Sequence, residues 1–264
     1  MNQYLSSASL KSLAKGQLLG NYGILAGILA IHILCIVPVT FSLSPLSGVS
    51  TLLYCAASYV ISILSGFFIA GETFVYLKLA CSQRPVLSDL FCCLTQGAQK
   101  AVKVLRIQSI LAAVSILCTL PSTYIGNSLT KSILSTETSF DVFPFSPALF
   151  LFYTILLVAG SVLDIFFNLL FSQIYYLMFD FPEYSETQLF KMSMQLIRGN
   201  KGRLFYIELS FLPLIILCLM SCGIGFLWLF PYMQATYANF YLDLVRKQGA
   251  ARRNKPVQNK EPSV

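Results

Sequence analysis

Five long apolar stretches constrain this chain more than any other feature. They run over residues 21–43, 50–79, 104–121 and 146–179, with the last extending from about 204 to 244. A bilayer core about 30 Å thick needs roughly 20 helical residues, so every stretch is long enough to cross a membrane. Charged residues make up only 11% of the 264 residues, and the mean hydropathy is +0.71. A soluble globule is excluded because it could not cover so much apolar surface.

Basic residues gather on alternate connections between these stretches. If Lys11 and Lys15 lie in the cytoplasm, the Lys- and Arg-rich connections within residues 78–106 and 191–203 face the cytoplasm too. The connection around residues 121–146 holds a single Lys and should face outward. Because cytoplasmic loops of membrane proteins carry an excess of Lys and Arg, the net charge of +7 indicates membrane topology and not a nucleic-acid partner.

The last apolar stretch is twice the length of one crossing. If it crossed only once, the basic C-terminal tail would lie outside, against the charge distribution. A turn at Ser221-Cys222-Gly223-Ile224-Gly225 removes this conflict. We therefore predict an all-α polytopic membrane protein with six transmembrane helices, arranged as three hairpins, and both termini in the cytoplasm. The alternative has five spans, with residues 231–246 lying in the membrane interface.

A short segment with apolar residues at helical spacing precedes each hairpin and predicts a cytoplasmic amphipathic helix. The first covers about residues 7–19, and the second starts near Pro85. The third begins at Ser185, which fits a capping box with Gln188, and ends at Gly199-Asn200. We expect these helices to lie in the headgroup layer with their apolar face toward the lipid.

Sequence motifs recur along the chain. Residues 20–25 (GNYGIL) match residues 199–204 (GNKGRL) at four of six positions. The returning spans share an aromatic end, which reads Val75-Tyr76-Leu77, Tyr175-Tyr176-Leu177 and Phe240-Tyr241-Leu242. These matches predict three repeated units. The alternative is that the Tyr side chains mark the membrane interface, where aromatic residues are enriched.

The predicted units cover about residues 4–82, 83–182 and 183–247, within a single integral membrane domain of residues 1–247. Residues 248–264 are polar, basic and Pro-containing. This composition predicts a disordered cytoplasmic tail.

The C-terminal motifs resemble those of a known family. They are Gly199-Asn200-Lys201 followed by Phe205, Gly223-Ile224-Gly225, Pro231-Tyr232 and Asn239-Phe240-Tyr241. Together they are similar to small integral membrane proteins of Gram-positive bacteria, catalogued as domain of unknown function 975. The resemblance extends from Leu10-Lys11 to Tyr241 and implies a multi-pass protein of the bacterial cytoplasmic membrane. It implies no catalytic residue.

One face of the fourth span carries a polar stripe near the middle of the membrane, formed by Ser161, Asp164, Asn168 and Ser172. Their spacing of three and four residues places them on one side of a helix. A carboxyl group there should face other helices and not lipid. The stripe is either a substrate or proton site, or a clamp in which Asn168 bonds a neighbouring helix.

Charged residues also lie near the predicted cytoplasmic boundary. Glu72 and Glu208 are expected to meet water there, or to pair with Lys78, Arg203 or Arg198. A second hypothesis concerns Arg198, Asn200, Lys201 and Arg203, which precede or begin the fifth span. Cations beside a helix N-terminus favour an anion, which predicts a lipid-phosphate site. Ordinary anchoring of the span by positive charge explains the same residues.

Motifs for catalysis and metal binding are absent from the sequence. The chain has one histidine, His32, and its eight cysteines show no C-x-x-C or zinc-ligand spacing. His32 is expected to contact a neighbouring helix. The sequence contains no H-E-x-x-H, P-loop or G-x-S-x-G motif. We therefore predict no catalytic residue, no metal and no cofactor.

These features predict a non-enzymatic polytopic membrane protein. Its partners would be the lipid bilayer, including anionic lipid headgroups, and a membrane protein or a second copy of the chain, but no nucleic acid. The alternative function is a small transporter or channel that uses the polar stripe around Asp164 and Asn168.

Overall fold

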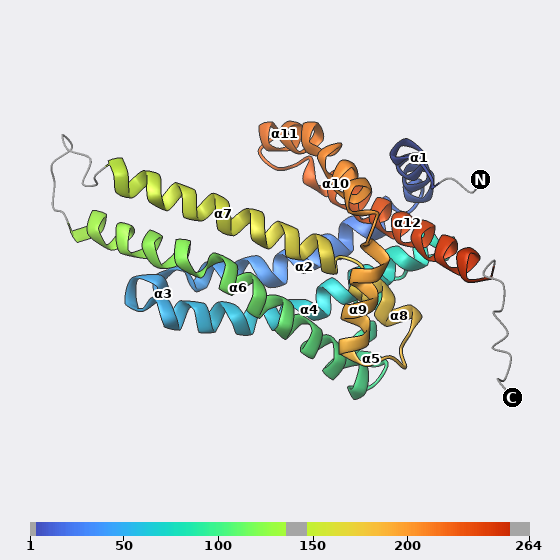
Figure 1. Cartoon of the computed structure of the whole chain (residues 1–264), viewed down its shortest axis with the longest axis horizontal. Coiled ribbons are helices and arrows are strands. Elements are labelled where there is room, and N and C mark those ends of the chain that lie inside the picture. The colour runs from blue at the N-terminus through green and yellow to red at the C-terminus, as the bar shows by residue number, and fades with distance from the viewer. Residues whose placement is uncertain (1–3, 136–146, 254–264) are drawn as a thin grey trace, which may run out of the picture.

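The computed structural model describes residues 4–135 and 147–253, which form helices joined by short connections (Figure 1). The long helices are α2 (Tyr22–Ser42), α4 (Thr51–Ala80), α6 (Ala98–Ser135), α7 (Pro147–Phe171) and α12 (Phe226–Arg253). The short helices are α1 (Ser7–Leu18), α3 (Ser44–Val49), η1 (Leu87–Phe91), α5 (Cys92–Thr95), α8 (Ile174–Asp180), α9 (Glu186–Ile197), α10 (Lys201–Leu209) and α11 (Leu212–Met220).

The long helices α2, α4, α6 and α7 run along the long axis of the molecule (Figure 1). The short helices α1, α5 and α9 gather at one end, where α1 packs against α12. The buried core concentrates at this end and includes Leu10, Ile107 and Phe240, each fully buried. Toward the opposite end, apolar side chains such as Phe41 and Leu52 are 78% exposed. Lipid contact accounts for this exposure, since a bilayer solvates apolar side chains as well as a protein core does.

Five segments are long and apolar enough to cross a membrane, within the part of the chain that the structure describes. They are Tyr22–Val49, Thr51–Ala80, Ala98–Thr130, Ala148–Asp180 and Lys201–Met220. The expected sixth span, α12, is not among them, so the sixth crossing stays a prediction. The turn between α11 and α12 also lies short of the end of the molecule marked by α3 (Figure 1).

Most of helix α12 from Pro231 to Val245 is buried or half-buried against other helices. It packs against α1, α2 and α4, and Ala238, Tyr241 and Leu244 are completely buried. Its Asn239 exchanges hydrogen bonds of 2.7 and 3.2 Å with Gln17 of α1. A helix that is enclosed by other helices does not have to be apolar on every face to lie within a membrane.

Three helices depart from the expected boundaries. Helix α6 continues through Pro121 to Ser135, although the sequence predicted an outward connection from Pro121 onward. The fourth apolar stretch is interrupted at Ser172–Gln173, between α7 and α8, and the fifth at Ser210–Phe211, between α10 and α11. Backbone groups released by such interruptions need other partners inside a membrane.

Side chains of the short helices supply partners at both interruptions. Ser193 of α9 donates to the carbonyl oxygen of Leu170 at 2.9 Å. The ammonium group of Lys11 in α1 donates to the carbonyl oxygen of Ser210 at 3.1 Å and lies 3.9 Å from the centre of the Phe211 ring. Burial lowers the pKa of Lys11, and the nearby charge of Lys15 lowers it further. The short helices therefore hold the interrupted spans.

Short helices occupy all three segments that the sequence predicted to be amphipathic. Ser6 and Ser185 stand at the N-caps of α1 and α9, each 12 residues long. Each helix ends in the same turn, with a glycine in the left-handed region at Gly20 (φ +83°) and Gly199 (φ +87°); Gly97, which precedes α6, is left-handed too. Only glycine adopts this conformation without strain. Location of these helices in the headgroup layer stays a prediction.

The three tyrosines that recur at the ends of the returning helices lie in the core. Tyr76, Tyr176 and Tyr241 are 1%, 3% and 0% exposed. Tyr176 and Tyr241 stack with ring centres 5.0 Å apart, and the Tyr241 hydroxyl donates to Asp180 at 2.5 Å. These tyrosines are therefore packed against other helices and do not face lipid with their rings.

Candidate functional site

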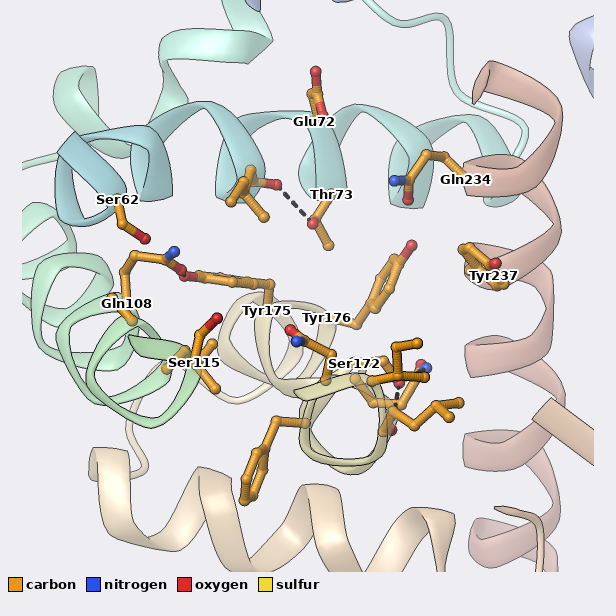
Figure 2. A pocket seen from close by; sticks show the side chains of 18 of the residues that line it. Ser62, Glu72, Thr73, Gln108, Ser115, Ser172, Tyr175, Tyr176, Gln234 and Tyr237 are labelled. Carbon is orange, nitrogen blue, oxygen red and sulfur yellow. Dashed lines mark hydrogen bonds between the residues drawn. The ribbon is translucent and has the colours of Figure 1, made fainter. Parts of the chain in front are cut away.

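A cavity of about 680 Å³ lies between α2, α4, α6, α7, α8, α10 and α12 (Figure 2). Its size falls within the 300–1,000 Å³ typical of small-molecule sites. Many of its walls are polar although the surrounding helices are apolar. The polar residues that line it are His32, Ser62, Glu72, Thr73, Gln108, Ser115, Asn168, Ser172, Gln173, Tyr175, Tyr176, Glu208, Gln234 and Tyr237.

Two consecutive tyrosines at the start of α8 point toward different walls of the cavity. The Tyr175 hydroxyl donates to the side-chain oxygen of Gln108 in α6 at 2.5 Å. The side chain of Tyr176 points toward the space between α4 and α12, where Gln234 lies (Figure 2). Because α7 ends at Phe171, the interruption at Ser172–Gln173 brings both tyrosines and Gln173 to the cavity.

Two buried polar atoms in the cavity wall have no hydrogen-bond partner among the described residues. They are the side-chain oxygen of Gln173, which is 0% exposed, and the hydroxyl of Tyr176, which is 3% exposed. A buried polar group that lacks a partner costs about 1–3 kcal/mol. Both residues line the cavity, and both atoms are closed off inside its wall.

The charged groups of the cavity are acidic. Glu72, 6% exposed, lies with its Oε1 2.7 Å from Nδ1 of His32, and the His32 ring stacks on Phe68. Glu208 has no recorded side-chain partner in the described structure. Lys and Arg do not occur among the described residues that line the cavity. A carboxyl group without a basic partner either takes up a proton or favours a cation beside it.

The contacts of Glu72 and Glu208 differ from those expected. Lys78 pairs with Asp89 at 2.7 Å, and Arg203 pairs with Asp243 at 2.8 Å. The predicted pairing of either glutamate with these cations is therefore wrong. Helix α4 turns Glu72 toward α2, and sequence distance alone could not indicate this direction. The expectation that His32 contacts a neighbouring helix agrees with its bond to Glu72.

The predicted polar stripe is divided by the structure. Asn168 and Ser172 line the cavity, whereas Ser161 and Asp164 do not. Ser161 is exposed and bonds the Leu157 carbonyl of its own helix. Asp164 is half-buried, and its Oδ1 lacks a partner among the described residues. The Asn168 amide donates to the Asp164 carbonyl of its own helix at 2.9 Å.

The four residues of the predicted lipid-phosphate site also separate. Arg203 pairs with Asp243, donates to the carbonyl oxygen of Leu5 at 2.8 Å and lies over the Tyr4 ring. Asn200 is 6% exposed and accepts from Arg203 at 3.4 Å. Both therefore contribute to internal contacts that hold the chain before α1. Arg198 and Lys201 are exposed.

Gln108 and Gln173 escaped the sequence analysis, and Tyr175 and Tyr176 entered it only as part of a repeated motif. Each is an uncharged polar residue inside an apolar stretch. Such a residue indicates a binding site less strongly than a carboxylate does, because it is less costly to bury in a membrane. Interrupted apolar helices are a further pointer to membrane binding sites, and Pro213 after the second interruption was the visible sign. No cluster of three or more His, Cys, Asp or Glu suited to a metal occurs among the described residues. The arrangement suits binding by hydrogen bonds and charge.

Comparison with curated proteins gave no match, and neither did comparison with solved structures. The model of one protein family matches residues 1–248, which is nearly the whole chain. That family carries the description "Protein of unknown function (DUF975)". Five apolar helices of membrane-spanning length agree with the membrane protein that the sequence motifs implied. The chain belongs to the DUF975 family of proteins of unknown function.

Proposed function

We propose that this chain is a non-enzymatic, multi-pass protein of the bacterial cytoplasmic membrane that binds a small, positively charged organic solute and carries it across the membrane. The observation behind the proposal is the cavity itself, which is lined by the carboxyl group of Glu208, by uncharged polar side chains and by aromatic rings. Of the two functions considered from the sequence, the transporter is the one this cavity supports.

The charged groups that line the cavity indicate which class of solute it binds. Two carboxyl groups and one histidine line the cavity without a lysine or arginine among its described residues. Glu72 is bonded to His32, which leaves Glu208 to meet the charge of a solute. An ammonium group would offset this carboxylate, whereas an anion would be repelled by it.

Aromatic side chains in the cavity wall also favour a solute with an ammonium group. Tyr175, Tyr176, Tyr237 and Phe230 all line the cavity. Aromatic ring faces attract ammonium groups, and quaternary ammonium ligands are commonly recognised in this way. All the residues that line the cavity come from one chain, so the proposal invokes neither a protein partner nor a second copy. We propose six spans with both termini in the cytoplasm, because α1 and α12 meet at one end of the bundle.

Binding of matched cationic and neutral probes tests the proposal. Purified protein in nanodiscs is titrated with choline and with 3,3-dimethyl-1-butanol, which has nearly the same shape but no charge; tetramethylammonium and ethanolamine extend the series. We expect the wild type to prefer choline at least tenfold, and Glu208→Gln to reduce the preference below threefold. A tenfold change in affinity equals about 1.4 kcal/mol.

The control is Glu183→Gln, which removes the same charge from an exposed site outside the cavity and should keep the wild-type preference. Equal affinity of the wild type for each cation and its neutral counterpart, or no binding of any ammonium ion, contradicts the proposal.

A further inference from the structure

A groove of about 380 Å³ lies on the outer side of α7, α9 and α10, away from the interior residues that define the solute cavity. It is lined by Leu170, Lys191, Met194, Gln195, Arg198 and Lys201. Three of these residues are cations, all three are exposed, and none of the described lining residues is acidic. No ion pair is recorded for these cations within the described structure, so their charge is available to a ligand.

An apolar pocket of about 240 Å³ adjoins the groove. Phe166, Leu169, Leu170, Ile197 and Phe205 form its walls, and it shares Leu170 and Lys201 with the groove. The ammonium group of Lys201 lies 5.2 Å from the centre of the Phe166 ring, at the border between charge and apolar surface. Phe166 is 46% exposed and Phe205 is 55% exposed, as expected for side chains that face lipid.

We infer that the groove and the pocket together bind one phospholipid with a net negative headgroup. Lys191, Arg198 and Lys201 hold its phosphate by charge and hydrogen bonds. One acyl chain occupies the pocket between α7 and α10. This site replaces the four-residue set expected from the sequence, because Asn200 and Arg203 are engaged inside the protein and Lys191 joins the cations.

The apolar pocket is what identifies the ligand as a lipid. A free phosphate ion would use the three cations but gain nothing from Phe166, Leu169 and Phe205. An acidic peptide would have to place its chain among apolar residues of two membrane-spanning segments, where unpaired backbone groups are costly. Leu169 lines both this pocket and the solute cavity, so α7 separates the two sites.

Native mass spectrometry of the full-length protein tests the inference. The protein is delipidated and titrated with dioleoyl phosphatidylglycerol or dioleoyl phosphatidylcholine, with inorganic phosphate or glycerol 3-phosphate as competitor. We expect phosphatidylglycerol to bind at least tenfold more tightly than phosphatidylcholine, without displacement by either soluble phosphate. Lys191→Gln/Arg198→Gln should lower that affinity at least tenfold, and Phe205→Ala should lower it for both lipids.

The control is Arg84→Gln/Lys100→Gln, which removes the same two charges at residues outside the groove and the pocket, and it should bind as the wild type does. The thermal midpoint of each variant confirms that it folds, which we expect because Lys191 and Arg198 are exposed. Wild-type lipid affinity in Lys191→Gln/Arg198→Gln overturns the inference. Displacement by inorganic phosphate also overturns it and indicates a phosphate-ion site.

Discussion

At Gly71, helix α4 closely approaches the backbone of η1. A Cβ atom added there would overlap the carbonyl oxygen of Leu90 in η1. Backbone cannot withdraw as a flexible side chain does, so α4 and η1 would have to separate. Gly71 also precedes Glu72 directly, so this approach fixes the part of α4 from which Glu72 reaches His32.

We predict that Gly71→Ala lowers the free energy of unfolding by about 1–3 kcal/mol. The thermal midpoint in detergent, followed by circular dichroism, measures the effect. Gly16→Ala is the matched control, because Gly16 lies in α1 with no atom within 4 Å of an added Cβ. Alanine is a better helix former, so the control should be neutral or slightly stabilising. A Gly71→Ala midpoint equal to the wild type's would show that α4 and η1 are not in such close contact.

At the scale of residues, the sequence predicted which polar residues share a face of one helix, but not which residues of different helices are in contact. Asn168 and Ser172 were predicted to share a face, because helical spacing determines that alone. The contact of Tyr175 with Gln108 joins residues 67 positions apart. It depends on how α6 and α8 pack, which no local pattern contains. The partner of Glu72, His32 in α2, could not be predicted for the same reason.

At the scale of elements, Arg203 ties the N-terminal helix to the centre of the bundle. It bonds Asp243 of α12 at 2.8 Å and the backbone just before α1, and only 8% of the Asp243 side chain is exposed. Removal of one partner of a buried ion pair leaves the other charge uncompensated. We predict that Arg203→Met or Asp243→Asn costs about 3–5 kcal/mol, and that the double variant costs clearly less than the sum.

The control for this double-mutant cycle is the pair Arg106–Glu186, in which 67% of the Arg106 side chain is exposed. Surface pairs contribute about 0–1 kcal/mol, so its coupling should be near zero. Limited proteolysis of the N-terminal segment provides a second readout, since the backbone just before α1 should become accessible when Arg203 is lost. If the losses of unfolding free energy in Arg203→Met and Asp243→Asn simply add in the double variant, the two side chains do not stabilise the protein as a pair.

The ends of the short helices could be predicted from the sequence, whereas the interruptions of the long ones could not all be. Gly20 and Gly199 end their short helices in equivalent turns, and the capping box at Ser185 starts α9, because these signals act within a few residues. The interruptions at Ser172–Gln173 and Ser210–Phe211 have partners far along the chain, Ser193 and Lys11. The interruption at Ser172–Gln173 therefore depends on tertiary contacts, whereas Pro213 marks the one at Ser210–Phe211 in the sequence.

At the scale of the whole molecule, the number of crossings decides where the tail lies. Helix α12 packs along α1, so both ends of the described chain lie at the same end of the bundle (Figure 1). Hydropathy alone could not settle α12, because a helix inside a bundle carries polar residues such as Asn239 and Asp243 on protein-facing sides.

We predict that the two termini lie on the cytoplasmic side. Fusions at the N- and C-terminus to green fluorescent protein should fluoresce, and fusions to alkaline phosphatase should be inactive, because these reporters function on opposite sides of the membrane. A fusion between α6 and α7 is the control and should give the reverse pattern. An active phosphatase at the C-terminus would indicate five crossings.

Uptake into proteoliposomes tests most directly whether the cavity carries a cation across the membrane. The ammonium ion that binds best is supplied outside vesicles that contain the wild type, Glu208→Gln or Glu183→Gln. We predict saturable uptake by the wild type and Glu183→Gln, competed by other ammonium ions but not by the neutral isostere, and loss of uptake in folded Glu208→Gln. Wild-type uptake no faster than in protein-free vesicles, or full uptake by Glu208→Gln, would contradict this account.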